Sequence, residues 1–233
     1  MTVLAVDTSS EHASLALATE RGVLHEVALP AKFYSTTLHQ EIADLLSRAR
    51  MPLQNLSGYA VTTGPGPFTG VRLGLTCVKG LAEAGGKAVI AISTLQALAW
   101  QGLGTGGVGP ESVLVPILDA HRGQVFAAAF RAAEDSFETL ICEMVGSLHS
   151  FLVQLQSSEI HNVQFCGSGM DRFEPEILGA GWGPESILPV PNHLAPALAK
   201  MGVERLKKGL AVAPAAVDAN YVRPSDAELF WKE

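Results

Sequence analysis

The chain has 233 residues, of which 48% are hydrophobic and 17% are charged, and this composition excludes a disordered chain, a collagen and a disulfide scaffold. The 16 Lys and Arg residues against 23 Asp and Glu residues give a net charge of −7. That charge repels phosphate backbones and excludes strong nucleic-acid binding by the chain alone.

The cysteines and the hydropathy pattern indicate a cellular location. Cys77, Cys142 and Cys166 are an odd set without CxxC spacing, which is typical of free thiols in a reducing compartment. We expect them to behave as small buried hydrophobic residues. No apolar run reaches the roughly 18 residues of a membrane span, so we expect a cytoplasmic protein without a membrane anchor.

The first half predicts a β-meander followed by a β-α-β unit. An apolar run at residues 3–6 closes on Asp7, and the chain resumes as strands at 14–18 and 23–29. A helix capped by Ser35 or Thr36 then stops at Met51-Pro52. Next come a strand at 59–62, a glycine loop at 64–70, a helix to about Ala84 and a strand at 87–92. Antiparallel strands beside parallel ones flanked by helices predict an α/β lobe.

The second half repeats this outline. Residues 101–110 hold five glycines and a proline, a linker composition, so we place lobes at 1–105 and 106–233. A strand at 113–118 ends on Asp119 as the first strand ends on Asp7, and Gly167 follows a strand as Gly64 does. The repetition predicts duplicated lobes. A last helix at 192–208 belongs to the second lobe in sequence but is free to pack back towards the first, and the segment around Pro224 reads as a tail.

The glycine loop at 64–70 allows two interpretations. It precedes a helix, where unpaired N–H groups suit an anion, yet Pro65 and Pro67 remove donors, so it is either a phosphate loop or a rigid turn. Asp7 and Asp119 either hold a metal–nucleotide across an interlobe cleft or cap their turns. The candidate nucleotide residues are Asp7, Gly64, Gly66, Thr69, Gly70, Asp119, Gly167 and Gly169.

No catalytic or metal centre emerges from the motifs. The seven histidines include no H-x-E-x-H pair, and no nucleophile–base set stands beside the two aspartates. We therefore predict no catalytic residue and no metal site in this chain.

The helix after the glycine loop is apolar around most of its circumference, so it must be covered on two sides. One side faces the sheet. Gly70, Gly74 and Gly80 lie near the other side. Glycine destabilises a helix relative to alanine, and the close approach of another helix backbone would explain why glycines occur there. That cover is either a partner protein or the helix at 38–49 of this chain, and the pattern leaves both open.

Three segments resemble the TsaB/YeaZ family: residues 4–9 (LAVDTS), 64–74 (GPGPFTGVRLG) and 118–126 (LDAHRGQVF). The resemblance implies an actin/Hsp70/sugar-kinase-like (ASKHA) fold with two related lobes. It also implies a subunit that does not catalyse by itself. Such subunits pair with TsaD, the metal-containing enzyme that transfers a threonylcarbamoyl group to the adenosine beside the tRNA anticodon. A TsaD-like catalyst would need histidines near residues 95–99, where this chain reads LQALA.

The resemblance also implies the partners. The helices at 36–50 and 68–84 would contact TsaD and form homodimers, a TsaE-like ATPase would join the complex, and tRNA would be bound only indirectly. We expect no intrinsic cofactor, with ATP or ADP in the assembled complex. The alternative is a nucleotide-dependent ATPase or small-molecule kinase of the same fold. The implied interface residues are Leu38, Ile42, Leu45, Arg72, Leu73, Gly74, Cys77, Lys79 and Leu81.

Overall fold

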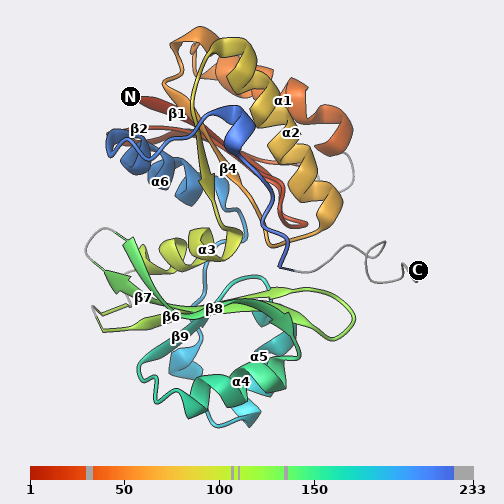
Figure 1. Ribbon diagram of the computed structural model, residues 1–233, viewed down its shortest axis with the longest axis vertical. Coiled ribbons are helices and arrows are strands. Elements are labelled where there is room, and N and C mark those ends of the chain that lie inside the picture. The colour runs from red at the N-terminus through yellow and green to blue at the C-terminus, as the bar shows by residue number, and fades with distance from the viewer. Residues whose placement is uncertain (30–33, 106–107, 110, 134–135, 223–233) are drawn as a thin grey trace. The chain divides into compact units, whose positions relative to one another are not determined.

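The computed structural model describes residues 1–29, 34–105, 108–109, 111–133 and 136–222 (Figure 1). The chain divides into two compact units. The first contains Met1–Ala97 and His193–Tyr221, and the second contains Leu98–Asn192.

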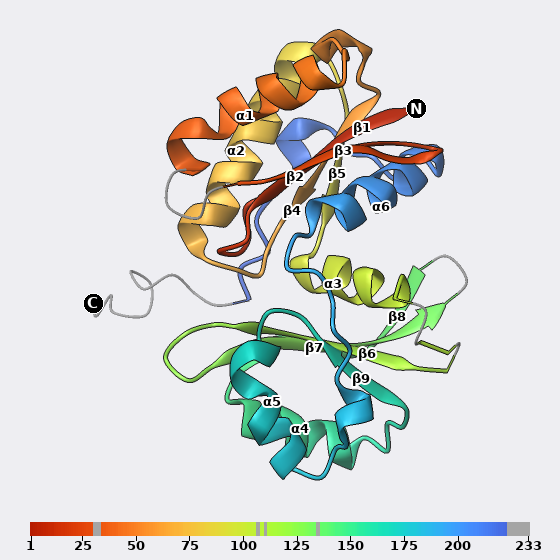
Figure 2. The same cartoon turned by 180° about the vertical axis from the view of Figure 1, so that it is seen from behind.

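The first unit is built on a five-stranded mixed sheet of order β3-β2-β1-β4-β5. The strands β1 (Thr2–Asp7), β2 (Ser14–Thr19) and β3 (Gly22–Ala28) form an antiparallel meander, and β4 (Gly58–Thr62) and β5 (Val89–Ile92) run parallel to β1. The helices α1 (Tyr34–Arg48) and α2 (Phe68–Gly85) cover one face, and α6 (Ala195–Lys207) covers the other (Figures 1 and 2). Short 3₁₀ turns occur at Leu53–Asn55 and Pro214–Ala216.

Alternation along the strands explains how the sheet is covered twice. Leu15 and Leu17 of β2 join the core under α1 and α2, so Ala16 and Ala18, which alternate with them, face α6. The small side chains on that face allow close packing: a Cβ at Gly202 of α6 would lie 2.8 Å from Ala60 Cβ and 3.0 Å from Val3 Cγ1. A sheet buried on both faces reads as continuous apolar runs, as the strands do in the sequence.

The second unit repeats the topology with a four-stranded sheet of order β8-β7-β6-β9. Its strands are β6 (Val113–Asp119), β7 (Val125–Ala133), β8 (Ser136–Gly146) and β9 (Val163–Cys166). The helices are α3 (Thr94–Leu103), which begins in the first unit, α4 (Leu148–Ser157) and α5 (Met170–Gly179), with a 3₁₀ turn at Pro184–Ser186. In each unit a meander is extended by a strand parallel to its first strand. The predicted α/β fold with duplicated lobes is confirmed.

The predicted lobe limits differ from the observed units. Residues 98–105 lie in the second unit and residues 193–221 in the first, because α6 packs on β1 and β2. The predicted linker at 101–110 is helical as far as Leu103, since Gly102 serves close packing: a Cβ there would lie 3.1 Å from Leu114 Cδ2 and from Leu188 Cδ2. The predicted tail around Pro224 lies outside the described residues.

Candidate functional site

Asp7, the last residue of β1, is completely buried. Its Oδ1 accepts hydrogen bonds from the Ser9 N–H (3.0 Å), the Ser9 hydroxyl (2.6 Å) and the Thr62 hydroxyl (2.9 Å). Its Oδ2 has no hydrogen-bond partner among the described residues. Burial raises the pKa of Asp7 by more than the bonds from Ser9 and Thr62 and the charge of His193 lower it. The carboxyl group therefore joins the ends of β1 and β4, and it loses its proton less readily than a free aspartate does.

The turn after β1 fills the space beside the glycine loop. The Thr8 hydroxyl donates to the Gly70 carbonyl (2.7 Å), and a Cβ at Gly74 would collide with that hydroxyl. A Cβ at Gly66 would collide with the Ser9 carbonyl oxygen. These contacts give the glycines a packing role and favour the rigid-turn interpretation of the loop. The expectation that a second helix backbone approaches Gly74 is wrong, because Thr8 occupies that position.

The same loop is held at its start and lacks a side-chain cap. Gly64 has φ +99°, in the left-handed region that favours glycine, and its carbonyl accepts from the Thr94 N–H at 2.8 Å. Pro67 occupies the N-cap of α2 without a side-chain hydrogen bond. Thr69, one of the predicted phosphate ligands, is exposed on the first turn of α2.

The corresponding acid of the second unit, Asp119, lies in a different environment. Its side chain is 28% exposed and forms an ion pair with Arg172 (Oδ2 to Nη1, 2.8 Å), and its Oδ1 accepts from the His121 N–H at 2.7 Å. Partial burial raises the pKa of Asp119, but the bonds from Arg172 and His121 lower it by more, so it stays below the usual value.

Gly167 and Gly169 repeat the packing role seen in the first unit. A Cβ at either would lie within 2.6 or 2.7 Å of the Ile117 carbonyl oxygen, respectively, and the Gly169 N–H donates to that oxygen at 3.0 Å. Asp7 and Asp119 belong to separate units, and the interlobe nucleotide site predicted from them stays a prediction.

Five of the predicted interface residues are buried inside the first unit. Leu38, Ile42 and Leu45 of α1, with Cys77 and Gly74 of α2, pack in its own core or against Thr8, so as the unit stands they offer a partner no surface. The reason is that the apolar stripe of α1 covers β2 and contacts α2, where the Cys77 Sγ lies 3.7 Å from His39 Nε2. The helix at 38–49 thus supplies part of the second cover of α2.

The other four predicted interface residues lie on the outside of α2. Arg72 is exposed, whereas Leu73, Lys79 and Leu81 are half-buried. Lys79 Nζ donates to the Val217 carbonyl at 2.8 Å. Gly80, between Lys79 and Leu81, is exposed, and outside its own helix turn a Cβ there would have no atom of the described residues within 4 Å. These five residues form the outer face of α2. The helix α1 lies beside α2 (Figures 1 and 2).

A surface cluster adjoins this face, and Arg72 is the one member of it that was predicted as a site residue. Phe68 and Tyr221 are 40% and 45% exposed, and their rings stack with centroids 5.3 Å apart. The Arg72 guanidinium lies 3.8 Å from the Phe68 centroid, and its Nε donates to the Tyr221 hydroxyl at 2.7 Å. Tyr221 is 149 residues from Arg72 in the sequence, so no local spacing signals the contact. We call these three residues the Arg72 stack.

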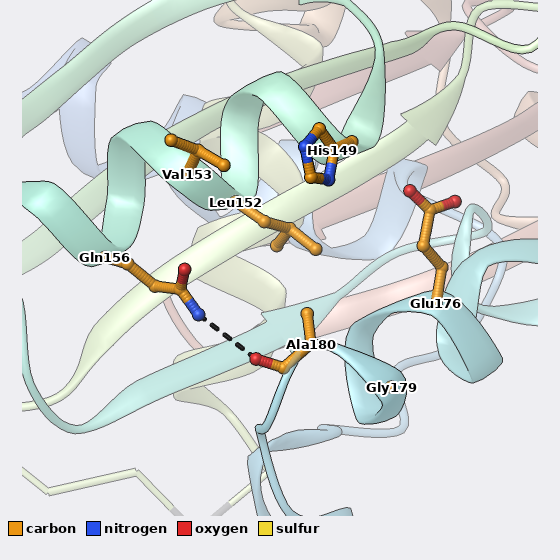
Figure 3. A pocket seen from close by; sticks show the side chains of 7 residues that line it. All are labelled: His149, Leu152, Val153, Gln156, Glu176, Gly179 and Ala180. Carbon is orange, nitrogen blue, oxygen red and sulfur yellow. Dashed lines mark hydrogen bonds between the residues drawn. The ribbon is translucent and has the colours of Figure 1, made fainter.

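A hollow of about 460 Å³ lies in the second unit between α4 and α5 (Figure 3). The Gln156 amide donates to the Ala180 carbonyl across it at 3.1 Å. His149 and Glu176 add one imidazole and one carboxylate to an otherwise mostly apolar lining of Leu152, Val153, Gly179 and Ala180. None of the predicted site residues lines this hollow.

The described residues provide neither a metal-binding cluster nor a membrane-spanning helix. They contain no group of three or more His, Cys, Asp or Glu side chains that could hold a metal ion. Within the same residues, no helix has the length and apolar character to cross a membrane.

The three cysteines are free. Burial raises the pKa of Cys77 to about 11 and that of Cys166 to about 12, whereas Cys142 is exposed, so the expectation of burial fails for it.

Comparisons with known proteins agree on one family. The family model described as TsaD: tRNA N6-adenosine threonylcarbamoyltransferase matches residues 6–212. The Bacillus subtilis (strain 168) tRNA threonylcarbamoyladenosine biosynthesis protein TsaB is 32% identical over 68% of this chain and 68% of that protein. TsaB of Haemophilus influenzae (strain ATCC 51907 / DSM 11121 / KW20 / Rd) is 27% identical over 100% of this chain and 97% of that protein.

A solved structure extends the likeness to the fold. A Pseudomonas aeruginosa protein described as similar to peptidase YEAZ superposes with a TM-score of 0.77 at 26% identity, covering 95% of this chain and 99% of that one. The segments that resemble TsaB in the sequence are those that form β1, the glycine loop with α2, and the β6–β7 turn. The chain therefore belongs to the TsaB/YeaZ family, within the wider group that the TsaD family model describes.

Proposed function

We propose that the chain is a non-catalytic subunit required for threonylcarbamoyl transfer to the adenosine beside the anticodon of tRNA. It acts by forming a heterodimer with a TsaD-like catalytic subunit. The names of its relatives support the pathway. The observation that carries the mode of action is the outer face of α2, which combines half-buried leucines with a bare glycine on the surface of the first unit.

Gly80 supports the proposal that the outer face of α2 binds a partner. A glycine inside a helix costs about 1 kcal/mol relative to alanine. Contact with Thr8 accounts for Gly74, but outside its own helix turn no described atom lies within 4 Å of a Cβ at Gly80. A helix of the catalytic subunit packed closely against Gly80, between Leu73 and Leu81, would account for it. The net charge of −7 also suits a subunit that leaves tRNA contact to its partner.

The first unit's packing favours this function over the ATPase or kinase alternative. A metal–nucleotide at the glycine loop would need free space beside it and an accessible Asp7. The side chain of Thr8 and the carbonyl of Ser9 fill that space, and Asp7 is buried on bonds from Ser9 and Thr62. Titration calorimetry with ATP and magnesium tests the point: submillimolar binding by the isolated chain would favour the alternative. ATP or ADP in the assembled complex stays a prediction.

Assembly beyond the heterodimer is also part of the proposal. We predict that the isolated chain forms a homodimer through the same helices, that a TsaE-like ATPase joins the heterodimer, and that tRNA is bound only indirectly. We also predict a cytoplasmic location, as expected from the free cysteines.

The test is heterodimer formation with the TsaD-like subunit of the same organism, followed by light-scattering chromatography. We expect Leu81→Glu to abolish the heterodimer, since it places a charge in the apolar part of the outer face. Leu210→Glu is the matched control, because Leu210 is a 59% exposed leucine that follows α6. Undiminished assembly of a folded Leu81→Glu variant would contradict the proposal.

A further inference from the structure

The Arg72 stack brings together side chains that protein interfaces favour. Tyr, Phe and Arg are enriched in interfaces, and Tyr and Arg are among the residues that most often dominate the binding energy. Phe68 and Arg72 are one helical turn apart on α2, so both side chains point to the same side of the helix. Tyr221 closes the group from the far end of the chain, with its ring inclined by only 26° to that of Phe68.

The segment that carries Tyr221 is fixed to the first unit at several points. The Val217 side chain is 2% exposed in the core, and its carbonyl accepts from Lys79 Nζ at 2.8 Å. The Asn220 N–H donates to the Thr63 carbonyl at 2.7 Å. Tyr221 is therefore held against α2 by the residues that precede it, and Arg72 is held by Tyr221.

The Arg72 guanidinium has a recognition edge formed by its two Nη atoms. Its Nε is used by the Tyr221 hydroxyl and one face lies over the Phe68 ring. Within the described part of the chain neither Nη atom has a hydrogen-bond partner. A planar guanidinium with two adjacent free nitrogens matches a carboxylate in a bidentate pair. Because its rotamer is already fixed, binding loses less side-chain entropy than it would for a mobile arginine.

We propose that Arg72, positioned by Phe68 and Tyr221, is the docking point for a carboxylate side chain of the TsaD-like subunit, and that Tyr221 belongs to that interface. The inference rests on the proposed function and adds a second contact beside the leucines of α2. A carboxylate complements the fixed guanidinium in both charge and planar geometry. The exposed rings of Phe68 and Tyr221 provide apolar contact around the pair.

The experiment measures the affinity of the full-length chain for the TsaD-like subunit by titration calorimetry. We expect Arg72→Ala to weaken binding by about tenfold or more. Arg72→Lys should recover little of that loss, because an ammonium group keeps the charge but cannot donate the two parallel hydrogen bonds of a guanidinium. Tyr221→Phe keeps the ring and loses the hydrogen bond, so it should weaken binding by a few-fold, and Tyr221→Ala by more. The wild-type affinity should fall with added salt.

Controls separate this inference from the proposed function. Arg131→Ala removes an exposed arginine of the second unit that pairs with Glu138 and should leave affinity unchanged, and urea unfolding verifies that each variant folds. If the wild-type chain does not bind the TsaD-like subunit, the proposed function fails. If it binds, and Leu81→Glu abolishes binding while Arg72→Ala and Tyr221→Ala keep wild-type affinity, only the docking inference fails. The docking inference would also be overturned if the Arg72 and Tyr221 variants lost only the homodimer and formed the heterodimer as the wild type does.

Discussion

The two units share a strand, an acid and a turn, yet they use the acid differently. Asp7 ends β1 without exposure and accepts three hydrogen bonds from Ser9 and Thr62. Asp119 ends β6 at the surface and pairs with Arg172. The glycines that follow β4 and β9 have the same role in both units, since each set lets a loop approach a backbone carbonyl closely. The duplication thus preserves the backbone packing and leaves the chemistry of the acid free to differ.

The shared role of the glycines predicts the largest effect. Gly66→Ala and Gly169→Ala should each lower the free energy of unfolding by about 2 kcal/mol, because the added Cβ meets the backbone carbonyl of Ser9 or Ile117. Gly80→Ala is the matched control and should raise it by about 1 kcal/mol. Urea unfolding measures all three. A neutral Gly169→Ala beside a destabilising Gly66→Ala would break the equivalence of the units.

The buried acid predicts a stability that depends on pH. The folded state raises the pKa of Asp7, chiefly by burial, so its contribution is fully present below the unfolded pKa and is lost as pH rises through the folded pKa. Asp7→Asn cannot ionise. The free energy of unfolding of this variant, relative to that of the wild type, should therefore increase as the pH rises from 4 to 8. Urea unfolding across that range measures it. A constant difference would show that the Asp7 carboxyl ionises in the fold as easily as in the unfolded chain.

The partly exposed acid, Asp119, predicts a smaller effect on stability with the opposite pH dependence. The bonds from Arg172 and His121 keep the folded pKa of Asp119 low despite partial burial, so its contribution is present above the unfolded pKa and is lost as pH falls through the folded pKa. Asp119→Asn should cost less than about 1 kcal/mol at pH 7, as is usual for a surface pair, and the cost should shrink in acid. Parallel pH profiles for the Asp7→Asn and Asp119→Asn variants would remove the contrast between the units.

Local pattern was enough to predict most of the first unit. The helix expected to run from the glycine loop to about Ala84 is α2, Phe68–Gly85, and the meander and the β-α-β unit lie where the apolar runs place them. These elements follow from short-range periodicity. The helix α3 was missed because Gly102 and the glycines after it suggested a linker, whereas Gly102 packs against Leu114 and Leu188.

The candidate site was only partly predictable, because periodicity shows that a residue is buried without showing what covers it. The stripe of Leu38, Ile42 and Leu45 suits a partner or the chain's own core equally well, and the structure assigns it to the core. The contact between Arg72 and Tyr221 spans 149 residues and has no local signal. The different environments of Asp7 and Asp119 arise from side chains on other strands and helices, namely Thr62 and Arg172.

The central claim, a non-catalytic subunit that a TsaD-like enzyme requires, is tested most directly by reconstitution. Unmodified tRNA and threonylcarbamoyl-adenylate are incubated with the TsaD-like subunit, with this chain, or with both, together with any further subunits the assembly requires, and threonylcarbamoyladenosine is quantified in the digested tRNA. We expect product only when both proteins are present, and little with the Leu81→Glu variant. Full modification without this chain, or transfer by this chain alone, would contradict the account.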